Sequence, residues 1–369
     1  MFDLALMVFL LISPILLLPS IGNLTALQYY QYGVIDSTNS MLQLQFFQFG
    51  VIGLFIMSLF QRKVREYKDF WLSMFLAVCL INIFINPISI TMTVNIFLGF
   101  MLYKLVIEYT KNVKLVLIPI VVIATVNTIF SVLQVFNIHL IYNETNSVHG
   151  LMKISSHLGA YQALSVPILA MFNPMLAIIP LIGLVLSKTS TALIGAFVGG
   201  CYLLKHRIKN IGSLWVMLFM SLSALFIVVH RIEIFRELCT RIWIWKDTVT
   251  RLSFLGVGFC QFERVFDLPG NFFMAVYKGE VYYSTYSTYL YIIYSLGILA
   301  VPIFIWVYNQ LKLRNQDRVA RCLFASSVIL LTIGLGQSFM EFPRIAGTAI
   351  VIFGLLKIKQ GGLNGSVKV

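Results

Sequence analysis

Residues 115–136 read LVLIPIVVIATVNTIFSVLQVF, an apolar stretch that contains no charged residue. Lys111 and Lys114 come shortly before it, so the stretch has a sharp polar boundary. An α-helix needs about 20 apolar residues to cross the hydrocarbon core of a bilayer. The stretch therefore predicts a transmembrane helix.

The composition of the whole chain agrees with this interpretation. Of its 369 residues, 59% are hydrophobic and 11% are charged, and the mean hydropathy is +0.89. Soluble domains carry about a quarter charged residues, so this chain has too little polar surface to be one. A polytopic membrane protein is predicted, which excludes soluble nucleotide-binding enzymes, zinc fingers and coiled coils. The chain also lacks the phosphate-binding pattern G-x-x-x-x-G-K-S/T of an ATP-driven pump.

Other apolar stretches resemble the first and are separated by polar residues. Residues 157–204 are apolar throughout but are interrupted at Asn173-Pro174 and at 187–190, which predicts three short helices there. We expect about twelve transmembrane helices in a single all-α integral membrane domain over residues 1–369. They are residues 4–22, 44–60, 71–86, 90–107, 115–136, 157–172, 175–187, 190–204, 212–230, 284–307, 322–338 and 344–356.

The basic residues predict the orientation in the membrane. The chain has 27 Lys and Arg against 14 Asp and Glu, a net charge of +13, and 17 of the basic residues lie in five short segments. With the N-terminus in the cytoplasm, strict alternation of the helices places all five segments on the cytoplasmic side, as the positive-inside rule requires. Both termini are therefore expected in the cytoplasm, and the positive charge does not indicate a nucleic-acid partner. The segments are residues 61–70, 104–114, 205–209, 312–321 and 357–369.

One connection, residues 231–283, is much longer than most and lies on the external side in this arrangement. Connections this long are usually functional or disordered. Residues 232–252 favour an amphipathic helix, which would lie on the membrane surface or pack on the helix bundle. Trp243 and Trp245 suit the depth of the lipid headgroups. The expected apolar stripe consists of Ile234, Leu238, Ile242, Trp245, Val249 and Leu252.

Candidate binding groups gather at the external ends of the predicted helices. Gly256 and Gly258 permit a turn with exposed backbone N–H groups that could hold an anion, although most such pairs are only turns. Residues 280–289, EVYYSTYSTY, suit either sugar binding or the interfacial aromatic belt. Lys and Arg hold phosphate oxygens through charge-assisted hydrogen bonds, so a phosphate-bearing, lipid-linked substrate is expected at this face. Three further external corners carry Lys188, Arg344 and His157.

Four segments resemble, in the same order, the bacterial O-antigen polymerase and ligase superfamily of integral membrane glycosyltransferases. Residues 155–167 (SSHLGAYQALSVP) are similar to its Asn-His-x-Gly-rich helix start, and residues 184–195 (LVLSKTSTALIG) to its Thr-x-Ser-Arg-Gly type motif, with Lys188 in place of Arg. Residues 241–262 (RIWIWKDTVTRLSFLGVGFCQF) resemble its Arg…Trp…Gly-x-Gly…Phe segment, and residues 284–301 (STYSTYLYIIYSLGILAV) its re-entry segment. The resemblance covers about half of the chain.

The resemblance implies a reaction on the outer face of the bacterial plasma membrane. Glycan carried on undecaprenyl diphosphate is transferred to an incoming lipid-linked repeat unit, without nucleotide sugar, cofactor or metal. The departing diphosphate develops negative charge, which must be stabilised where it appears. Membrane lipid surrounds such an enzyme, and a chain-length regulator and a flippase are the protein partners implied. The cysteines themselves form no C-x-x-C metal motif.

The resemblance also assigns roles to individual residues. By position, Arg241 and Arg251 hold the diphosphate, Lys188 is a further phosphate contact, and the backbone of Gly256 and Gly258 adds N–H donors. The remaining residues expected to bind substrate are His157, Tyr286 and Arg344.

The choice between polymerase and ligase depends on a histidine. Ligases of the family carry one in the re-entry segment, whereas residues 231–369 contain none, so a polymerase is favoured. A carboxylate would then be the general base, with Glu280 the first candidate and Glu341 the second. A ligase is the first alternative, and a lipid-linked oligosaccharide flippase or other transporter is the second. A transporter would place charged residues near the middle of the membrane.

Overall fold

The computed structural model describes residues 1–13, 46–85, 90–138, 148–152, 155–205, 231–259, 264–269, 276–282, 285–312, 317–337 and 343–360. The regular secondary structure of these residues is helical except for one antiparallel hairpin, which the sequence does not predict. Four of the described helical segments are long and apolar enough to cross a membrane. The described part of the chain is therefore compatible with the predicted helical membrane protein.

The helices lie close to the predicted apolar stretches. Two predicted spans are exceptions, because residues 212–230 and the second half of 4–22 lie outside the described residues. The 3-10 turns are η2 (Pro174–Ala177) and η3 (Gly297–Ala300), and the hairpin consists of β1 (Arg264–Pro269) and β2 (Val276–Tyr282). The α-helices are α1 (Phe2–Ile12), α3 (Phe46–Leu59), α4 (Phe70–Ile85), α5 (Ile90–Tyr109), α6 (Val113–Val135), α7 (Ser155–Phe172), α8 (Ile178–Leu186), α9 (Ser190–Lys205), α11 (Arg231–Thr250), α12 (Thr288–Leu296), α13 (Val301–Gln310), α14 (Arg318–Gly336) and α15 (Pro343–Lys359).

Polar residues between the apolar stretches begin the helices that follow them. The side chains of Asn112, Asn173 and Asp317 accept hydrogen bonds from backbone N–H groups in the first turns of α6, η2 and α14. These N–H groups have no partner inside the helix, so each cap stabilises a helix start. The predicted break at Asn173-Pro174 is confirmed by this geometry.

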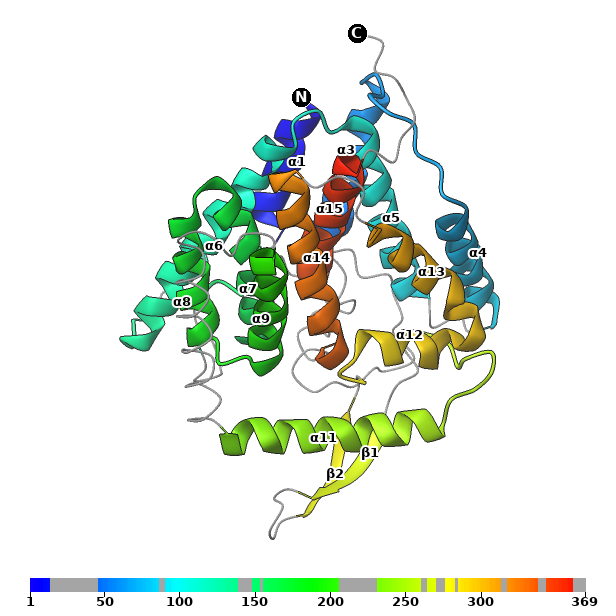
Figure 1. Ribbon diagram of the computed structural model, residues 1–369. Coiled ribbons are helices and arrows are strands. Elements are labelled where there is room, and N and C mark those ends of the chain that lie inside the picture. Colours follow the sequence, from blue (N-terminus) through cyan, green and yellow to red (C-terminus); the bar gives the residue numbers. More distant parts are fainter. Residues whose placement is uncertain are drawn as a thin grey trace.

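Helix α14 lies in the middle of the bundle and packs against α7, α9, α12 and α15 (Figure 1). Small residues allow the closest of these approaches. A Cβ atom added at Gly199 of α9 would lie 2.4 Å from the Ile329 side chain of α14, and one added at Gly195 would lie 2.9 Å from Ile333. Close backbone approach through glycine is a common way for helices to pack in a membrane.

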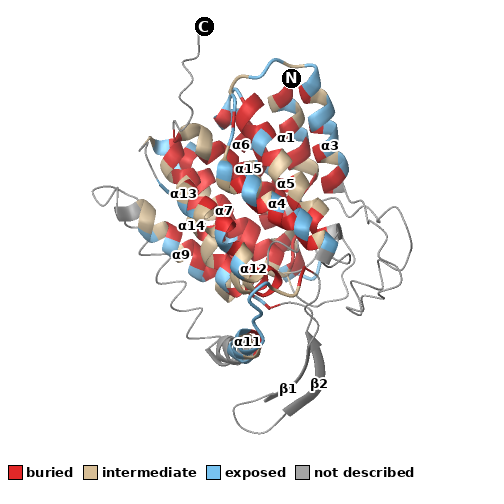
Figure 2. Cartoon of the chain, turned by 90° about the vertical axis from the view of Figure 1, so that its right-hand side faces the viewer, coloured by how far each residue is buried: buried red, intermediate tan, exposed pale blue. Residues whose placement is uncertain are grey.

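The outward sides of several helices carry exposed apolar side chains. Buried residues line the interior of the bundle, while exposed residues occur on its outward sides (Figure 2). A soluble protein rarely exposes contiguous apolar surface of this kind, whereas a bilayer solvates it. Exposed examples on α3, α4 and α6 are Phe55, Ile56, Met74, Ile81, Ile118, Val122 and Ile129.

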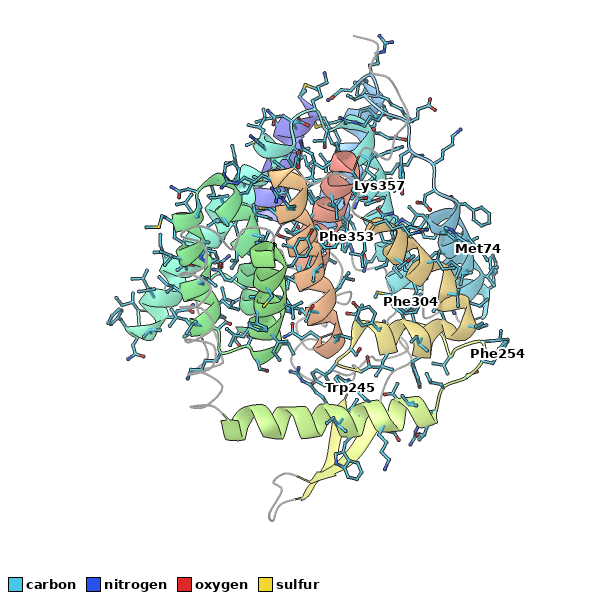
Figure 3. The ribbon with its side chains drawn as sticks, in the orientation of Figure 1. Met74, Trp245, Phe254, Phe304, Phe353 and Lys357 are labelled. Atoms are coloured by element: carbon cyan, nitrogen blue, oxygen red, sulfur yellow. The ribbon has the colours of Figure 1, made fainter. Side chains whose placement is uncertain are left out.

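Three ion pairs lie at one end of the bundle, where α1 begins and α15 ends (Figure 1). Glu108 lies 3.2 Å from Lys63 and 3.9 Å from Lys104, and Asp317 lies 3.3 Å from Lys359. Lys357 lies at the same end (Figure 3). Helix α11 lies across the opposite end (Figure 1). The two ends therefore differ in architecture.

The span predicted over residues 284–307 needs a correction, because it bends. Helix α12 ends at Leu296, and the next residue, Gly297, has a φ of 56° and a ψ of −133°, which suit glycine and few other residues. Helix α12 lies across the end of the bundle, and α13 then runs along it (Figure 1). Glycine is common in transmembrane helices, so the sequence alone does not show which glycine bends one.

Candidate functional site

Helix α11 rests against the bundle with a face that matches the predicted stripe only in part. Ile244 and Thr248 are buried, and the Trp245 indole donates a hydrogen bond to the Thr285 carbonyl at 3.0 Å. Figure 3 shows Trp245 between α11 and the bundle. Ile242 and Val249 of the predicted stripe are exposed instead. Hydrogen bonds to the bundle therefore set the rotation of α11, and apolar periodicity alone does not predict it.

Arg241 is held between two elements of the bundle. Its Nη1 atom donates a hydrogen bond to the Gly336 carbonyl oxygen at 2.9 Å, and its guanidinium carbon lies 5.9 Å from the centre of the Tyr286 ring. Gly336 is the last residue of α14, where carbonyl groups lack partners inside the helix and carry partial negative charge. A cation is therefore stabilised at this point, and the guanidinium is fixed in position.

The hydroxyl-rich segment before α12 serves mainly to join α12 to α14. The hydroxyls of Ser287, Thr288 and Tyr289 donate to carbonyl groups at the end of α14, at 3.5, 2.8 and 2.7 Å. These three side chains are therefore engaged in packing, which disfavours the sugar-binding interpretation for them. Tyr286 differs, because its backbone has a φ of 50° and its ring faces Arg241. A bulky residue at positive φ is strained, and such strain is concentrated at functional sites.

The turn between α8 and α9 leads to the same end of α14, at Gly336. Lys188 is exposed there and has a φ of 52°, the second strained site residue. One turn later, Thr191 contacts the end of α14. A Cβ atom added at Gly336 would lie 2.5 Å from Thr191 Cγ2 and 3.0 Å from Arg241 Nη1. Gly336 is thus the point at which α9, α11 and α14 meet.

Two buried polar atoms lie around Gly336, and the sequence does not predict a role for either. Thr191 Oγ1 and Gln337 Nε2 are buried, and neither has a hydrogen-bond partner in the described part of the chain. An unpaired buried polar group costs about 1–3 kcal/mol, so such atoms mark places where a ligand can complete the bonding. The only sequence signal for either residue is its place at the predicted end of a helix.

His157 lies deeper than the sequence suggests. It is buried in the first turn of α7, which packs on the turn between α8 and α9. The Thr189 hydroxyl donates to the Ser155 carbonyl oxygen at 3.1 Å, and a Cβ atom added at Gly159 would lie 2.7 Å from Thr189. His157 is thus beside the turn that carries Lys188 but is not part of its exposed surface.

The prediction that Gly256 and Gly258 form an anion cradle is wrong. The Gly256 N–H donates to the Ser253 carbonyl at 3.1 Å, and the Gly258 N–H donates to the Ser295 carbonyl at 2.8 Å. Both N–H groups are thus satisfied within the chain. The two glycines have φ values of 75° and 93°, and a Cβ atom at Gly256 would lie 2.3 Å from the Ser295 oxygen. The absence of side chains at Gly256 and Gly258 allows this segment to pack closely on the end of α12.

The structure separates Arg251 from Arg241. Arg251 is exposed at the end of α11, and its Nε atom donates to Asp247 Oδ1 at 3.0 Å, one helical turn away. Ten residues of α-helix extend about 15 Å, so the two guanidinium groups are not placed to hold one diphosphate together. The joint role expected for them is therefore not supported by the geometry.

Two predicted site residues have side chains that lie outside the described residues. Arg344 is in the first turn of α15, and Glu280 pairs with Phe266 across the hairpin. Glu341 itself lies outside the described residues. Within the described part of the chain, no group of three or more His, Cys, Asp or Glu side chains is arranged to hold a metal.

Comparison with known proteins adds no assignment. No protein-family model matches the sequence, and no curated protein matches it.

Proposed function

We propose that this chain is a polymerase of lipid-linked polysaccharide repeat units in the bacterial plasma membrane. It would transfer glycan from undecaprenyl diphosphate to an incoming lipid-linked repeat on the outer face. The observation that carries the proposal is the fixed guanidinium of Arg241, held between the end of α14 and the ring of Tyr286. The proposed topology has about twelve spans, cytoplasmic termini and an external loop over residues 231–283.

The position of three lysines agrees with this orientation. Lys63, Lys104 and Lys359 lie at the end of the bundle opposite α11, as expected for a cytoplasmic surface. Helix α11 would then lie at the outer surface, at the depth of the lipid phosphates. A diphosphate that joins a membrane lipid to a glycan has to be held at this depth.

The groups around Arg241 suit a diphosphate leaving group. An Arg that is already positioned stabilises developing negative charge without reorganisation. Such preorganised electrostatic stabilisation of the transition state is usually the largest contribution to the rate. Lys188, exposed in the turn that leads to Thr191, would add a second positive charge as a point charge. The buried atoms Thr191 Oγ1 and Gln337 Nε2 would donate hydrogen bonds to phosphate or glycan oxygens.

The structure gives less support to the transporter alternative. Transporters place ionisable residues inside the bundle, near the middle of the membrane. Among the described residues, Glu108 is the buried side chain of the Asp, Glu, Lys and Arg type, and it pairs with Lys63 and Lys104 at the end of the bundle. The buried histidines are His149, which precedes α7, and His157, which lies in its first turn. The ligase alternative would need its histidine in the re-entry segment, which here carries Tyr286 and Ser287.

Reconstitution into liposomes tests the proposal. The purified chain would receive an oligosaccharide on undecaprenyl diphosphate, and the products would be separated on a gel. A ladder of regularly spaced bands is the expected result. If the lipid-linked oligosaccharide moves between leaflets without growing, the chain is a transporter and the proposal is wrong.

A further inference from the structure

An apolar tip follows α11 and is exposed on the outside of the bundle. We use the term apolar tip for residues 252–255, which include Leu252, Phe254 and Leu255. The Phe254 side chain is 76% exposed and the Leu255 side chain is 57% exposed. Consecutive exposed side chains of this size are unfavourable in water and mark an interaction surface.

The tip is rigidly attached to the bundle. The Phe254 carbonyl accepts a hydrogen bond from the Ile298 N–H at 2.9 Å, and the Val257 N–H donates to the Tyr294 carbonyl at 3.1 Å. Beyond the tip, the Phe259 N–H donates to Asn82 Oδ1 of α4 at 3.4 Å. The exposure of Phe254 is therefore built into the fold and does not come from a loose end.

The tip continues an exposed apolar surface of the bundle. Ile298, to which it is bonded, lies at the bend between α12 and α13 and is 49% exposed. Val301, one turn later, is also exposed. Figure 3 shows Phe254 at the outer edge of the bundle, on the side where Met74 projects from α4. Exposed apolar side chains thus continue from the bundle to the tip.

We propose that the apolar tip inserts into the outer leaflet, between the lipid headgroups and the first part of the acyl chains. Aromatic side chains favour this depth, and the exposed Arg251, which immediately precedes the tip, is placed to meet lipid phosphates. The tip would then anchor one end of α11 in lipid, while Arg241 anchors its middle on the bundle. This inference rests on the chain being a membrane protein and not on the proposed reaction.

Photolabelling of the wild-type protein tests the proposal. The protein is placed in phosphatidylcholine vesicles that contain a lipid with a diazirine in the upper acyl chain. After irradiation, trypsin separates the tip peptide 252–264 from the neighbouring helix peptide 247–251 and from peptide 279–312, which carries Ile298. The lipid label is expected on 252–264 and 279–312, with only background on 247–251.

Two results would overturn the proposal. One is label on 279–312 with none above background on 252–264, which places the tip in water. The other is a tip peptide that cross-links to a second copy of the chain and excludes lipid. A variant with both Phe254→Ser and Leu255→Ser should lose label on 252–264 and keep it on 279–312. No substrate is needed, so failure of the polymerase assay would leave this test unaffected.

Discussion

Replacement of Gly297 by alanine tests how the segment after α11 is fixed to the bundle. A Cβ atom at this position would lie 2.2 Å from the Phe254 carbonyl oxygen and 2.6 Å from the Gly256 nitrogen. Both contacts are with backbone atoms, so no side chain can rotate away to relieve them. Either Gly297 adopts another conformation or the docked segment moves.

The two ways of relieving this clash have similar costs in free energy of unfolding. A side chain held in a backbone conformation of this kind costs about 1–3 kcal/mol. If the segment moves instead, the backbone hydrogen bonds made by the N–H groups of Val257, Gly258 and Ile298 are lost. Each contributes about 1 kcal/mol net, so Gly297→Ala should destabilise the docked segment by about 2–3 kcal/mol.

Thermal unfolding in detergent and limited trypsin digestion measure this effect. Gly200→Ala on α9 is the matched control, because an added Cβ atom there has no neighbour within 4 Å and alanine favours a helix by about 0.5–1 kcal/mol. Gly297→Ala should unfold at a lower temperature than the control and be cleaved faster after Arg251. Equal unfolding temperatures and equal cleavage would refute the docking argument.

Two further predictions concern the rest of the fold. Gln134→Leu should destabilise the protein by about 2–4 kcal/mol, because Gln134 Oε1 accepts bonds from two buried backbone N–H groups, one of them that of Gly150; the exposed neighbour Val135→Ala is the control, and equal unfolding temperatures would contradict the prediction. A hydrogen bond and charge from Glu108 raise the pKa of Lys63 above its ordinary value of 10.5. The stabilisation from this pair should therefore be complete below pH 10.5 and be lost as the pH rises through the raised pKa. The difference in unfolding temperature between wild type and Lys63→Met should shrink above that pH, and a constant difference would show that charge plays no part.

The sequence predicts the positions of the helices well because they follow from length and polarity. The uncharged stretch that opens with Leu115 becomes α6, and the polar pair Asn173-Pro174 separates α7 from α8 as expected. The bend at Gly297 is missed, since its cause is a contact with the Phe254 backbone, far away in the sequence. The rotation of α11 is missed for the same reason, because its hydrogen-bond partners belong to other helices.

The candidate site is predicted in part. Arg241 and Tyr286 are both expected there, and the structure brings them together, although nothing in the sequence gives their contact. Gly256 is misassigned because a glycine that binds an anion and one that docks onto a helix end have the same sequence signal. Thr191 and Gln337 are missed because their importance comes from burial, which depends on the packed bundle.

Chain growth in liposomes by Arg241 and Arg251 variants tests the central claim most directly. Arg241→Ala should slow growth of the ladder by about 100-fold or more, the usual loss when one group that stabilises developing charge is removed. Arg251→Ala, a matched change on the same helix, should leave growth near wild type, because its side chain is exposed and paired with Asp247. Unfolding temperatures would confirm that both variants are folded. Wild-type growth by folded Arg241→Ala, or equal losses in the two variants, would contradict the account.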